Sequence, residues 1–264
     1  MNFTGKTIWI TGASSGIGKA VSLELSKENV HLILSGRNEN ALMEVGELCE
    51  KNGSSVQIIP FDLGDEKSVE NAAKKVLESG LKIDALYQFG GLSHRTFVSE
   101  TPLFVDRQIF EINYFGTIIL TKAILPEMIK NGGGHLAVTT SLVGKFGFPY
   151  RSAYSAAKQA LHGFFESLRA ENVKNNVKVS IIIPGRIKTN ISSNSLNKEG
   201  KPRRITDESL EKGMSVESAA KKIIRQLGNQ KKEIPVGGKE MIMLPIRRFF
   251  PRLFYYMAAR VKPL

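Results

Sequence analysis

Residues 11–18 read TGASSGIG, and they stand between an apolar run at residues 7–11 and an amphipathic segment that begins at Ile17. The apolar run is typical of a buried strand, and the segment after the glycines has helical spacing. Glycine lets a backbone turn tightly, and the free N–H groups of a helix N-terminus attract phosphate. The stretch therefore predicts a strand, a glycine turn and a helix that bind a pyrophosphate, with a tight turn that binds no ligand as the alternative.

The alternation of short apolar runs and amphipathic stretches continues along the chain. It predicts strands at residues 7–11, 30–34, 56–61, 83–87, 135–140, 177–183 and 233–236. It predicts helices at residues 17–28, 39–51, 66–78, 102–130, 153–174 and 215–227, the last with Ser215 as N-cap. Such alternation implies an α/β fold, a Rossmann-like doubly wound parallel sheet in a single domain of residues 1–236. Residues 186–213 are polar, and a loop of this length is usually functional or mobile.

The end of the second predicted strand, Ser35-Gly36-Arg37, bears on the choice of nucleotide. Proteins that bind NAD usually place an acidic residue there to hold the ribose hydroxyls. The acidic residue is missing, and Arg37 offers a partner for a 2′-phosphate. We therefore predict NADP(H) as the cofactor, with a solvated arginine at a strand end as the alternative.

Composition excludes several classes of protein. The chain has 264 residues, 42% of them hydrophobic, which is ordinary for a soluble globular core. Cys49 is the only cysteine, so no intrachain disulfide can form, and the N-terminus lacks the pattern of a signal peptide. These features predict a cytoplasmic protein. No metal-ligand spacing is present, so we predict no metal.

The net charge of +12 is unevenly distributed. Residues 230–264 hold eight basic and two acidic residues, which is half of the excess. A basic balance can indicate nucleic acid, an anionic membrane or an anionic ligand. The aromatic residues of this tail are clustered with aliphatic ones rather than spread along a basic groove, so we predict no nucleic-acid partner.

Tyr154 and Lys158 lie four residues apart in the stretch SAYSAAKQAL. On a helix this spacing puts the phenol and the ammonium on one face. A solvated helix face is the simplest explanation of such a pair. Motifs elsewhere in the chain decide whether the pair takes part in catalysis instead.

Taken together, these motifs resemble the short-chain dehydrogenase/reductase family. The glycine turn has the family's TGxxxGxG spacing, Asp62-Leu63 follows the third strand, and Pro184-Gly185 ends the sixth. Ser141 precedes Tyr154 by 13 residues, close to the family's separation. The resemblance spans about residues 6–235. It implies a catalytic set of Asn113, Ser141, Tyr154 and Lys158. It implies a cofactor site made of Gly12, Ser14, Ser15, Gly16, Ile17, Gly18, Arg37, Asp62, Leu63, Gly90, Gly91, Tyr154, Lys158, Pro184, Gly185, Ile187 and Thr189.

The resemblance also implies a mechanism. A free tyrosine has a pKa near 10, and a cation within about 4–6 Å lowers it, so Lys158 is expected to assist proton donation by Tyr154. Ser141 would orient the substrate oxygen, and Asn113 would hold a water that relays protons through Lys158. Members of the family are commonly homodimers or homotetramers.

One stretch departs from the family pattern. Where the family shows Asn-Asn-Ala-Gly after the fourth strand, this chain has Gln88-Phe-Gly-Gly91. The last glycine still permits close approach to the cofactor ribose, but the loss of the asparagine pair changes how neighbouring strands are tied together. A non-catalytic protein that senses NADP(H) is therefore the alternative to an enzyme.

The substrate is expected to be an apolar ketone or secondary alcohol, lipid-like or steroid-like. Phe146, Phe148 and Pro149 suggest an apolar wall, and His94 and Arg95 could meet a polar or anionic end, although a loop histidine is more often solvated. Residues 237–264 form a basic, aromatic extension that resembles the tail of the dehydrogenase/reductase member 7-like group. It suits an interfacial helix on an anionic membrane, or a helix packed over the substrate site or a partner subunit.

Overall fold

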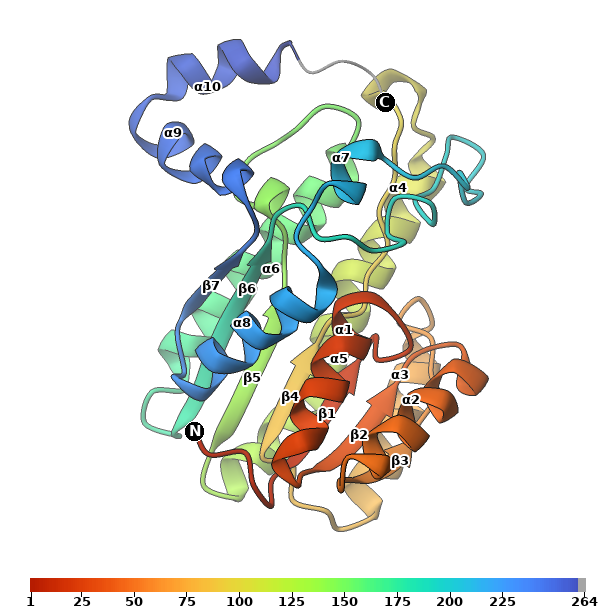
Figure 1. The fold of residues 1–264 in the computed structure, drawn as a ribbon, viewed down its shortest axis with the longest axis vertical. Coiled ribbons are helices and arrows are strands. Elements are labelled where there is room, and N and C mark those ends of the chain that lie inside the picture. The colour runs from red at the N-terminus through yellow and green to blue at the C-terminus, as the bar shows by residue number, and fades with distance from the viewer. Residues whose placement is uncertain (261–264) are drawn as a thin grey trace.

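Seven parallel strands form one sheet in the computed structural model, which describes residues 1–260 apart from the side chain of Ser209 (Figure 1). The strands are β1 (Thr7–Thr11), β2 (His31–Ser35), β3 (Ser55–Ile58), β4 (Ala85–Gln88), β5 (Gly134–Thr139), β6 (Val177–Pro184) and β7 (Glu233–Val236). Their order is β3-β2-β1-β4-β5-β6-β7, so the chain reverses direction across the sheet between β1 and β4. The predicted doubly wound parallel sheet is confirmed.

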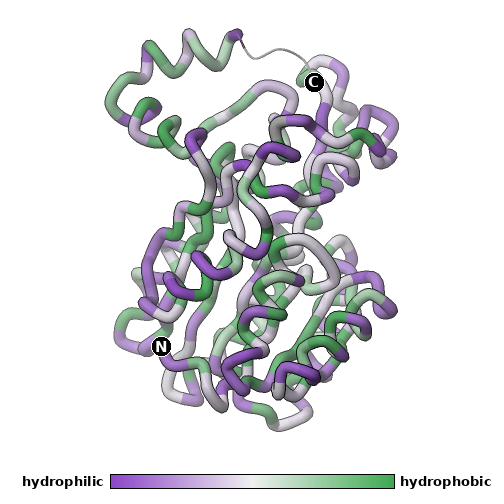
Figure 2. The backbone as a smooth tube through the Cα atoms, in the orientation of Figure 1, coloured by the Kyte–Doolittle hydropathy of each residue, from purple (hydrophilic) through white to green (hydrophobic). Residues whose placement is uncertain are grey.

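Helices cover both faces of the sheet (Figure 1). One apolar core lies under α1 (Gly16–Leu25), α2 (Glu39–Lys51) and α8 (Val216–Gly228). The other lies under α3 (Glu66–Glu78), α5 (Gly116–Lys130) and α6 (Ser152–Glu171). The inner strands β1, β4 and β6 are almost entirely buried, as expected for a parallel sheet covered on both sides. Figure 2 shows the hydrophobic stretches of chain along these packed elements.

Local sequence explains where several helices begin. The side chain of Ser215 accepts a hydrogen bond from the Ser218 N–H at 3.2 Å, so the predicted N-cap of α8 is confirmed. Asn38 and Asp65 cap α2 and α3 in the same way. These caps fix the ends of helices whose packing against the sheet then holds them in place.

Two predicted helices are less regular than expected. The first ends at Leu25 and continues as a 3-10 turn over Ser26–Glu28. The long helix near residues 102–130 consists of α4 (Leu103–Phe110), a π-helical turn (Glu111–Phe115) and α5. A π-helical turn inserts an extra residue, and such turns often mark functional positions. The stretch Leu103–Lys130 is long and apolar enough to cross a bilayer, yet half of its most apolar window is buried.

A third apolar cluster lies beyond the carboxyl edge of the sheet. It joins α4 and the start of α6 to the C-terminal segment, which comprises a 3-10 turn (Lys239–Ile242), α9 (Met243–Phe249) and α10 (Pro251–Ala258). The ring of Phe254 is buried and lies 4.7 Å from that of Phe146. The predicted extension therefore packs against the third apolar cluster, through Phe254 and through partly buried side chains such as Met243, Leu244 and Ile246. Its residues 261–264, including Lys262, lie outside the described part of the chain.

Residues 186–213 hold more structure than their composition predicted. They contain the short helix α7 (Glu208–Glu211), and Leu196 forms bridges to both His94 and Pro202. Asp207 and Leu196 are buried. The segment is thereby fastened to the loop that follows β4.

Candidate active site

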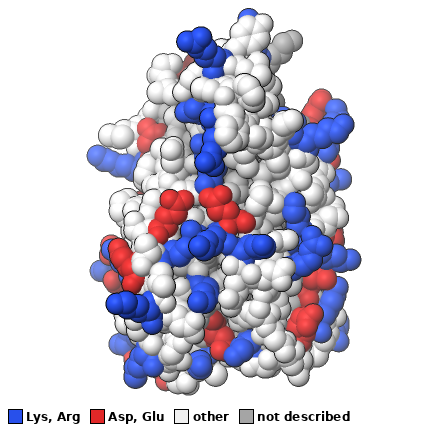
Figure 3. Space-filling view, turned by 90° about the vertical axis from the view of Figure 1, so that its left-hand side faces the viewer, with Lys and Arg blue, Asp and Glu red and all other residues white. Residues whose placement is uncertain are grey.

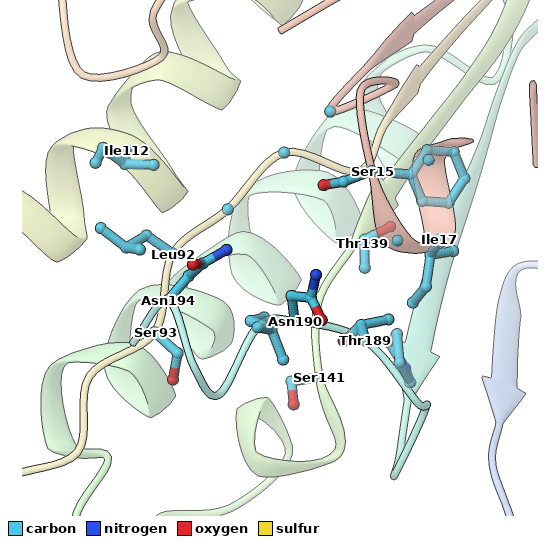
Figure 4. Close-up of a pocket in the computed structure, with 18 of the residues that line it drawn as sticks. Ser15, Ile17, Leu92, Ser93, Ile112, Thr139, Ser141, Thr189, Asn190 and Asn194 are labelled. Carbon is cyan, nitrogen blue, oxygen red and sulfur yellow. The ribbon is translucent and has the colours of Figure 1, made fainter. Parts of the chain in front are cut away.

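A cleft of about 270 Å³ opens at the carboxyl ends of the central strands. Figure 4 shows side chains converging on it from the glycine turn, from the end of β5 and from the loop after β6. The carboxyl edge of a parallel sheet, at the point where strand order reverses, is where such folds bind ligands. Of the residues predicted for the cofactor and catalytic sites, all line this cleft except Asn113.

Two glycines of the turn, Gly12 and Gly18, lie where no larger residue would fit. Gly12 has a φ of +68°, and a Cβ on it would come within 2.6 Å of the Gly90 nitrogen. A Cβ on Gly18 would overlap the carbonyl oxygen of Gly12. These glycines therefore keep the turn close to the Gln88–Gly91 segment, and the space beside them stays open.

The N-terminus of α1 offers donors to that space. Its N-cap residue, Ser15, makes no side-chain capping hydrogen bond, so the first N–H groups of the helix are not satisfied by a cap. Free N–H groups and the positive end of the helix dipole favour a phosphate. The cradle and the helix end together fit the pyrophosphate of a dinucleotide.

The far end of the cleft carries one cation and one carboxylate. Arg37 is exposed at the end of β2, and Asp62 is the one acidic side chain in the described lining. Asp62 accepts a hydrogen bond from the Gly64 N–H at 2.9 Å, which fixes it after β3. No acidic residue of the lining lies at the end of β2, where a carboxylate would face the ribose hydroxyls of NAD.

Ser141, Tyr154 and Lys158 come together at the inner end of the cleft. Ser141 follows β5, where its hydroxyl accepts from the Val143 N–H and hydrogen-bonds Tyr154. The ammonium of Lys158 lies 5.9 Å from the centre of the Tyr154 ring and donates to the Thr139 carbonyl at 2.9 Å. Both side chains are buried, so the pair is not a solvated helix face.

Burial changes the proton affinities of this pair. It raises the pKa of Tyr154 above its usual value, opposed by the hydrogen bond from Ser141 and by the charges of Arg151 and Arg95. Burial lowers the pKa of Lys158 to about 7. The two guanidinium groups oppose the effect of burial on Tyr154, and the expected assistance by Lys158, whose ammonium lies beside the ring, stays a prediction.

Asn113 does not line the cleft. Its amide nitrogen donates to the carbonyls of Leu92 (2.7 Å) and Ile109 (2.8 Å), and its oxygen accepts from the Leu92 N–H (3.1 Å). A Cβ on Gly91 would lie 2.7 Å from that oxygen and 3.2 Å from Lys158 Nζ, so the two side chains flank Gly91. The π-helical turn thus ties α4 to the loop after β4, close to Lys158.

The unusual Gln88 has a structural partner. Its side-chain nitrogen donates to the Thr121 hydroxyl at 2.8 Å in a fully buried setting. This hydrogen bond links β4 to helix α5. The absence of the family's asparagine pair had suggested that the connections between elements would differ here. Gly90 and Gly91 still reach the cleft.

The predicted substrate contacts are placed differently from expectation. His94 is fully buried, so it is not solvated, and it does not line the cleft. Arg95 lines the cleft, but its guanidinium is bonded to Asp207, Ser93 and the His94 carbonyl. Phe146, Phe148 and Pro149 do not line the cleft, since Phe146 faces the third apolar cluster.

Sequence reasoning also missed residues of the lining. Arg151, which precedes α6, and Asn190 and Asn194, in the loop after β6, carried no motif. Phe89 was visible only as a departure from the family pattern. Position next to a motif was the one available signal for Arg151, three residues before Tyr154.

Comparisons with known proteins agree with this geometry. The family model described as short chain dehydrogenase matches residues 6–200. A dehydrogenase/reductase SDR family member 7B from Xenopus laevis is 39% identical over 261 residues, covering 96% of this chain and 81% of the relative. A dehydrogenase/reductase SDR family protein 7-like from Drosophila melanogaster is 35% identical over 97% of this chain and 80% of the relative.

Solved structures share the fold. An alcohol dehydrogenase from Thermococcus sibiricus, complexed with 5-hydroxy-NADP, has a TM-score of 0.75 and 27% identity, covering 89% of this chain and 97% of that one. A short chain dehydrogenase/reductase from Burkholderia phymatum, in complex with NAD, has a TM-score of 0.84 and 20% identity, covering 100% and 99%. The two nucleotides in these similar structures differ.

Proposed function

This chain belongs to the short-chain dehydrogenase family, and we propose that it is an NADP(H)-dependent oxidoreductase that reduces a ketone or oxidises the matching secondary alcohol. The observation that carries the proposal is the convergence of Ser141, Tyr154 and Lys158 at the inner end of the glycine-lined cleft. A buried phenol beside a serine hydroxyl can exchange a proton with a substrate oxygen. Asn113 is part of this proposal, because its side chain holds the loop after β4 in place beside Lys158.

The preference for NADP(H) over NAD(H) rests on Arg37. Its exposed guanidinium lines the cleft at the end of β2, where no carboxylate of the lining competes for the ribose. A guanidinium pairs well with a phosphate. Arg37→Ala should weaken NADPH binding about tenfold while leaving NADH binding nearly unchanged, measured by quenching of Trp9 fluorescence; equal losses for both nucleotides would remove the preference.

The residues of the chain divide the chemical work. The nicotinamide cofactor supplies or accepts hydride when bound. Ser141 would hydrogen-bond the substrate oxygen and orient it, and Tyr154 would give that oxygen a proton during reduction. Lys158, held by the Thr139 carbonyl, would contact the cofactor ribose and return protons to Tyr154.

Tyr154→Phe tests the chemistry directly. The variant keeps the ring and loses the proton, so turnover should fall by about two to four orders of magnitude while NADPH binding stays near that of the wild type. The assay follows oxidation of NADPH with a panel of apolar ketones. Near-normal turnover in Tyr154→Phe would contradict the proposal.

A protein that senses NADP(H) without turnover is the second candidate. The departure at Gln88–Gly91 favours it, since this segment borders the cofactor cradle. Tight NADPH binding without oxidation by any ketone, in the wild type as in Tyr154→Phe, would support the sensor over the enzyme.

The C-terminal segment supports a membrane-surface location for a lipid-like substrate. It exposes Phe249, Phe250, Leu253, Tyr255 and Tyr256, and its basic residues are Arg247, Arg248, Arg252 and Arg260. Figure 3 shows a row of basic side chains over the upper part of the face to which this segment belongs. Aromatic and basic groups side by side suit the interface of an anionic bilayer. Flotation with phosphatidylserine vesicles tests this location. The vesicles should recover the full-length protein, and removal of residues 237–264 should abolish recovery. Equal recovery of both proteins would reject this role.

A further inference from the structure

A histidine and two glutamates lie close together outside the cleft. His162 and Glu166 belong to α6, and Glu233 begins strand β7. One ligand atom from each side chain lies within 4.8 Å of the other two. None of the three residues is in the described lining of the cleft. The group is therefore separate from the proposed active site, and we name it the histidine–glutamate group.

The fold brings the three side chains to one place. His162 and Glu166 are one helical turn apart, so they share a face of α6. Strand β7 is the last in the sheet, and Glu233 pairs with Ile181, which belongs to the core under α6. The next residue, Ile234, packs in the opposite core. Since side chains alternate along a strand, Glu233 lies on the face that α6 covers.

His162 is the buried member of the group. Its side chain is 7% exposed, and neither ring nitrogen has a hydrogen-bond partner within residues 1–260. Buried polar atoms are nearly always paired, so two unpaired nitrogens that face two carboxylates point to a ligand. Burial, with the charge of Lys145, lowers the pKa of His162 to about 4. The imidazole is therefore neutral at neutral pH, which is the form that binds metal ions.

Two cations also lie near the group. Arg169 of α6 donates to the carbonyl of Lys232, just before β7, at 2.9 Å, so it fastens the helix to this edge of the sheet. Lys145 pairs with the Oε1 atom of Glu233. Glu233 has a second carboxylate oxygen, and Glu166 is exposed, so acceptor atoms remain for another cation. That cation competes with the ammonium of Lys145 for Glu233.

The spacing suits a small transition-metal ion after a modest movement. Zn²⁺ binds histidine nitrogen and carboxylate oxygen at about 2.0–2.2 Å, which sets tetrahedral ligands about 3.4 Å apart. The two glutamates are exposed and can rotate toward the imidazole, which is fixed by burial. Three protein ligands leave a fourth position for water. An imidazole among carboxylates favours Zn²⁺ over Mg²⁺ or Ca²⁺, which prefer oxygen alone.

We propose that His162, Glu166 and Glu233 bind a divalent transition-metal ion of the Zn²⁺ type, which joins α6 to the edge strand β7. The sequence predicted no metal, because Glu233 is remote from the other two residues along the chain and no ligand spacing marks it. Strand pairing and helix packing create the site.

Zinc titration of the untagged full-length protein tests the site. It is done after treatment with a chelator and without nucleotide or substrate, so its result is independent of the proposed function. A chromophoric zinc indicator should report a single tight site, and Zn²⁺ should raise the Tm. Glu166→Gln should weaken binding by about tenfold or more, since it removes a ligand from an exposed position. Glu171→Gln, the same change at an exposed position near the end of α6, is the matched control and should leave binding unchanged.

Two further variants examine the imidazole and the competing cation. His162→Leu keeps a buried apolar side chain and should lose zinc binding, yet without zinc it should be at least as stable as the wild type, because it removes unpaired polar atoms. Lys145→Met should bind Zn²⁺ about tenfold more tightly, because a positive charge beside Glu233 is removed.

Hydrogen exchange measures the link between the two elements. Zn²⁺ should slow exchange of the β7 amides in the wild type but not in His162→Leu. No binding with Zn²⁺ in large excess would overturn the inference. Binding that is equal in the wild type, Glu166→Gln and His162→Leu would also overturn it, since the ion would then lie elsewhere.

Discussion

The two halves of the cleft are held together by different kinds of contact. The proposed nucleotide half, residues 11–18, 35–37 and 88–91, is shaped by backbone that passes close to backbone, and Gly12 and Gly18 leave no room there for a Cβ. The proposed substrate half contains Arg151, Tyr154 and Lys158 and the supporting loops at residues 93–95 and 190–213. It is held by charged side chains that meet across up to 112 residues of sequence. The difference teaches that one half follows from local residue type, whereas the other depends on contacts that local patterns do not encode.

The largest effect on this comparison is expected from Asp207→Asn. The change leaves one buried and two half-buried guanidinium groups without their counter-charge, which should cost about 3–5 kcal/mol of unfolding free energy. Chemical denaturation measures the loss, and limited proteolysis should cut first within residues 186–213. Glu208→Gln is the control, since its ion pair with Lys212 is exposed and should contribute less than about 1 kcal/mol. Equal losses in both variants would show that the ion pairs of Asp207 do not hold this half of the cleft together.

An intermediate effect is expected from Gly18→Ala in the nucleotide half. The added Cβ would overlap the carbonyl of Gly12, which is backbone and cannot rotate away. We expect about 1–3 kcal/mol of destabilisation and no measurable NADPH binding, by denaturation and by Trp9 fluorescence. Gly163→Ala in α6, where a Cβ meets nothing within 4 Å, should be neutral or stabilising. Retained NADPH affinity in Gly18→Ala would show that the turn does not form the cradle.

The smallest effect is expected from acid acting on the substrate half. Burial and the charges of Arg95 and Arg151 lower the pKa of His94 to about 4, below its ordinary value of 6.5. The unfolded chain therefore binds more protons than the folded chain between these values, and stability falls as pH drops from 6.5 to 4. His94→Leu should reduce that fall by about 1–3 kcal/mol, measured by denaturation at both pH values. An identical fall in the variant would show that His94 does not contribute.

Much of the nucleotide half could be predicted because its residues carry their own conformational requirement. Gly12 adopts a positive φ, and Gly18 lets its backbone approach the carbonyl of Gly12 closely. The spacing of these glycines in the sequence therefore predicts the geometry of the turn. The alternation of strands and helices likewise predicted the sheet and both covering layers. The π-helical turn at Asn113 was not predicted, because its residues continue an ordinary helical pattern.

The substrate half could be predicted only in part. Tyr154 and Lys158 share a helical face by spacing alone, but the depressed pKa of Lys158 arises from burial by distant elements. His94 reads as an ordinary loop histidine and is instead fully buried. Arg95 reads as free for a substrate and is instead bonded to Asp207, because the loop after β6 folds back onto the loop after β4.

By itself, the sequence determined the doubly wound sheet and the glycine turn, because periodicity and glycine spacing act over a few residues, and its resemblance to a family picked out most of the predicted residues that line the cleft. Only the tertiary structure decided which charges surround Tyr154, because Arg95, Arg151 and Asp207 reach one another from three separate segments. Their electrostatic effect depends on burial, and burial is a property of the whole packed chain.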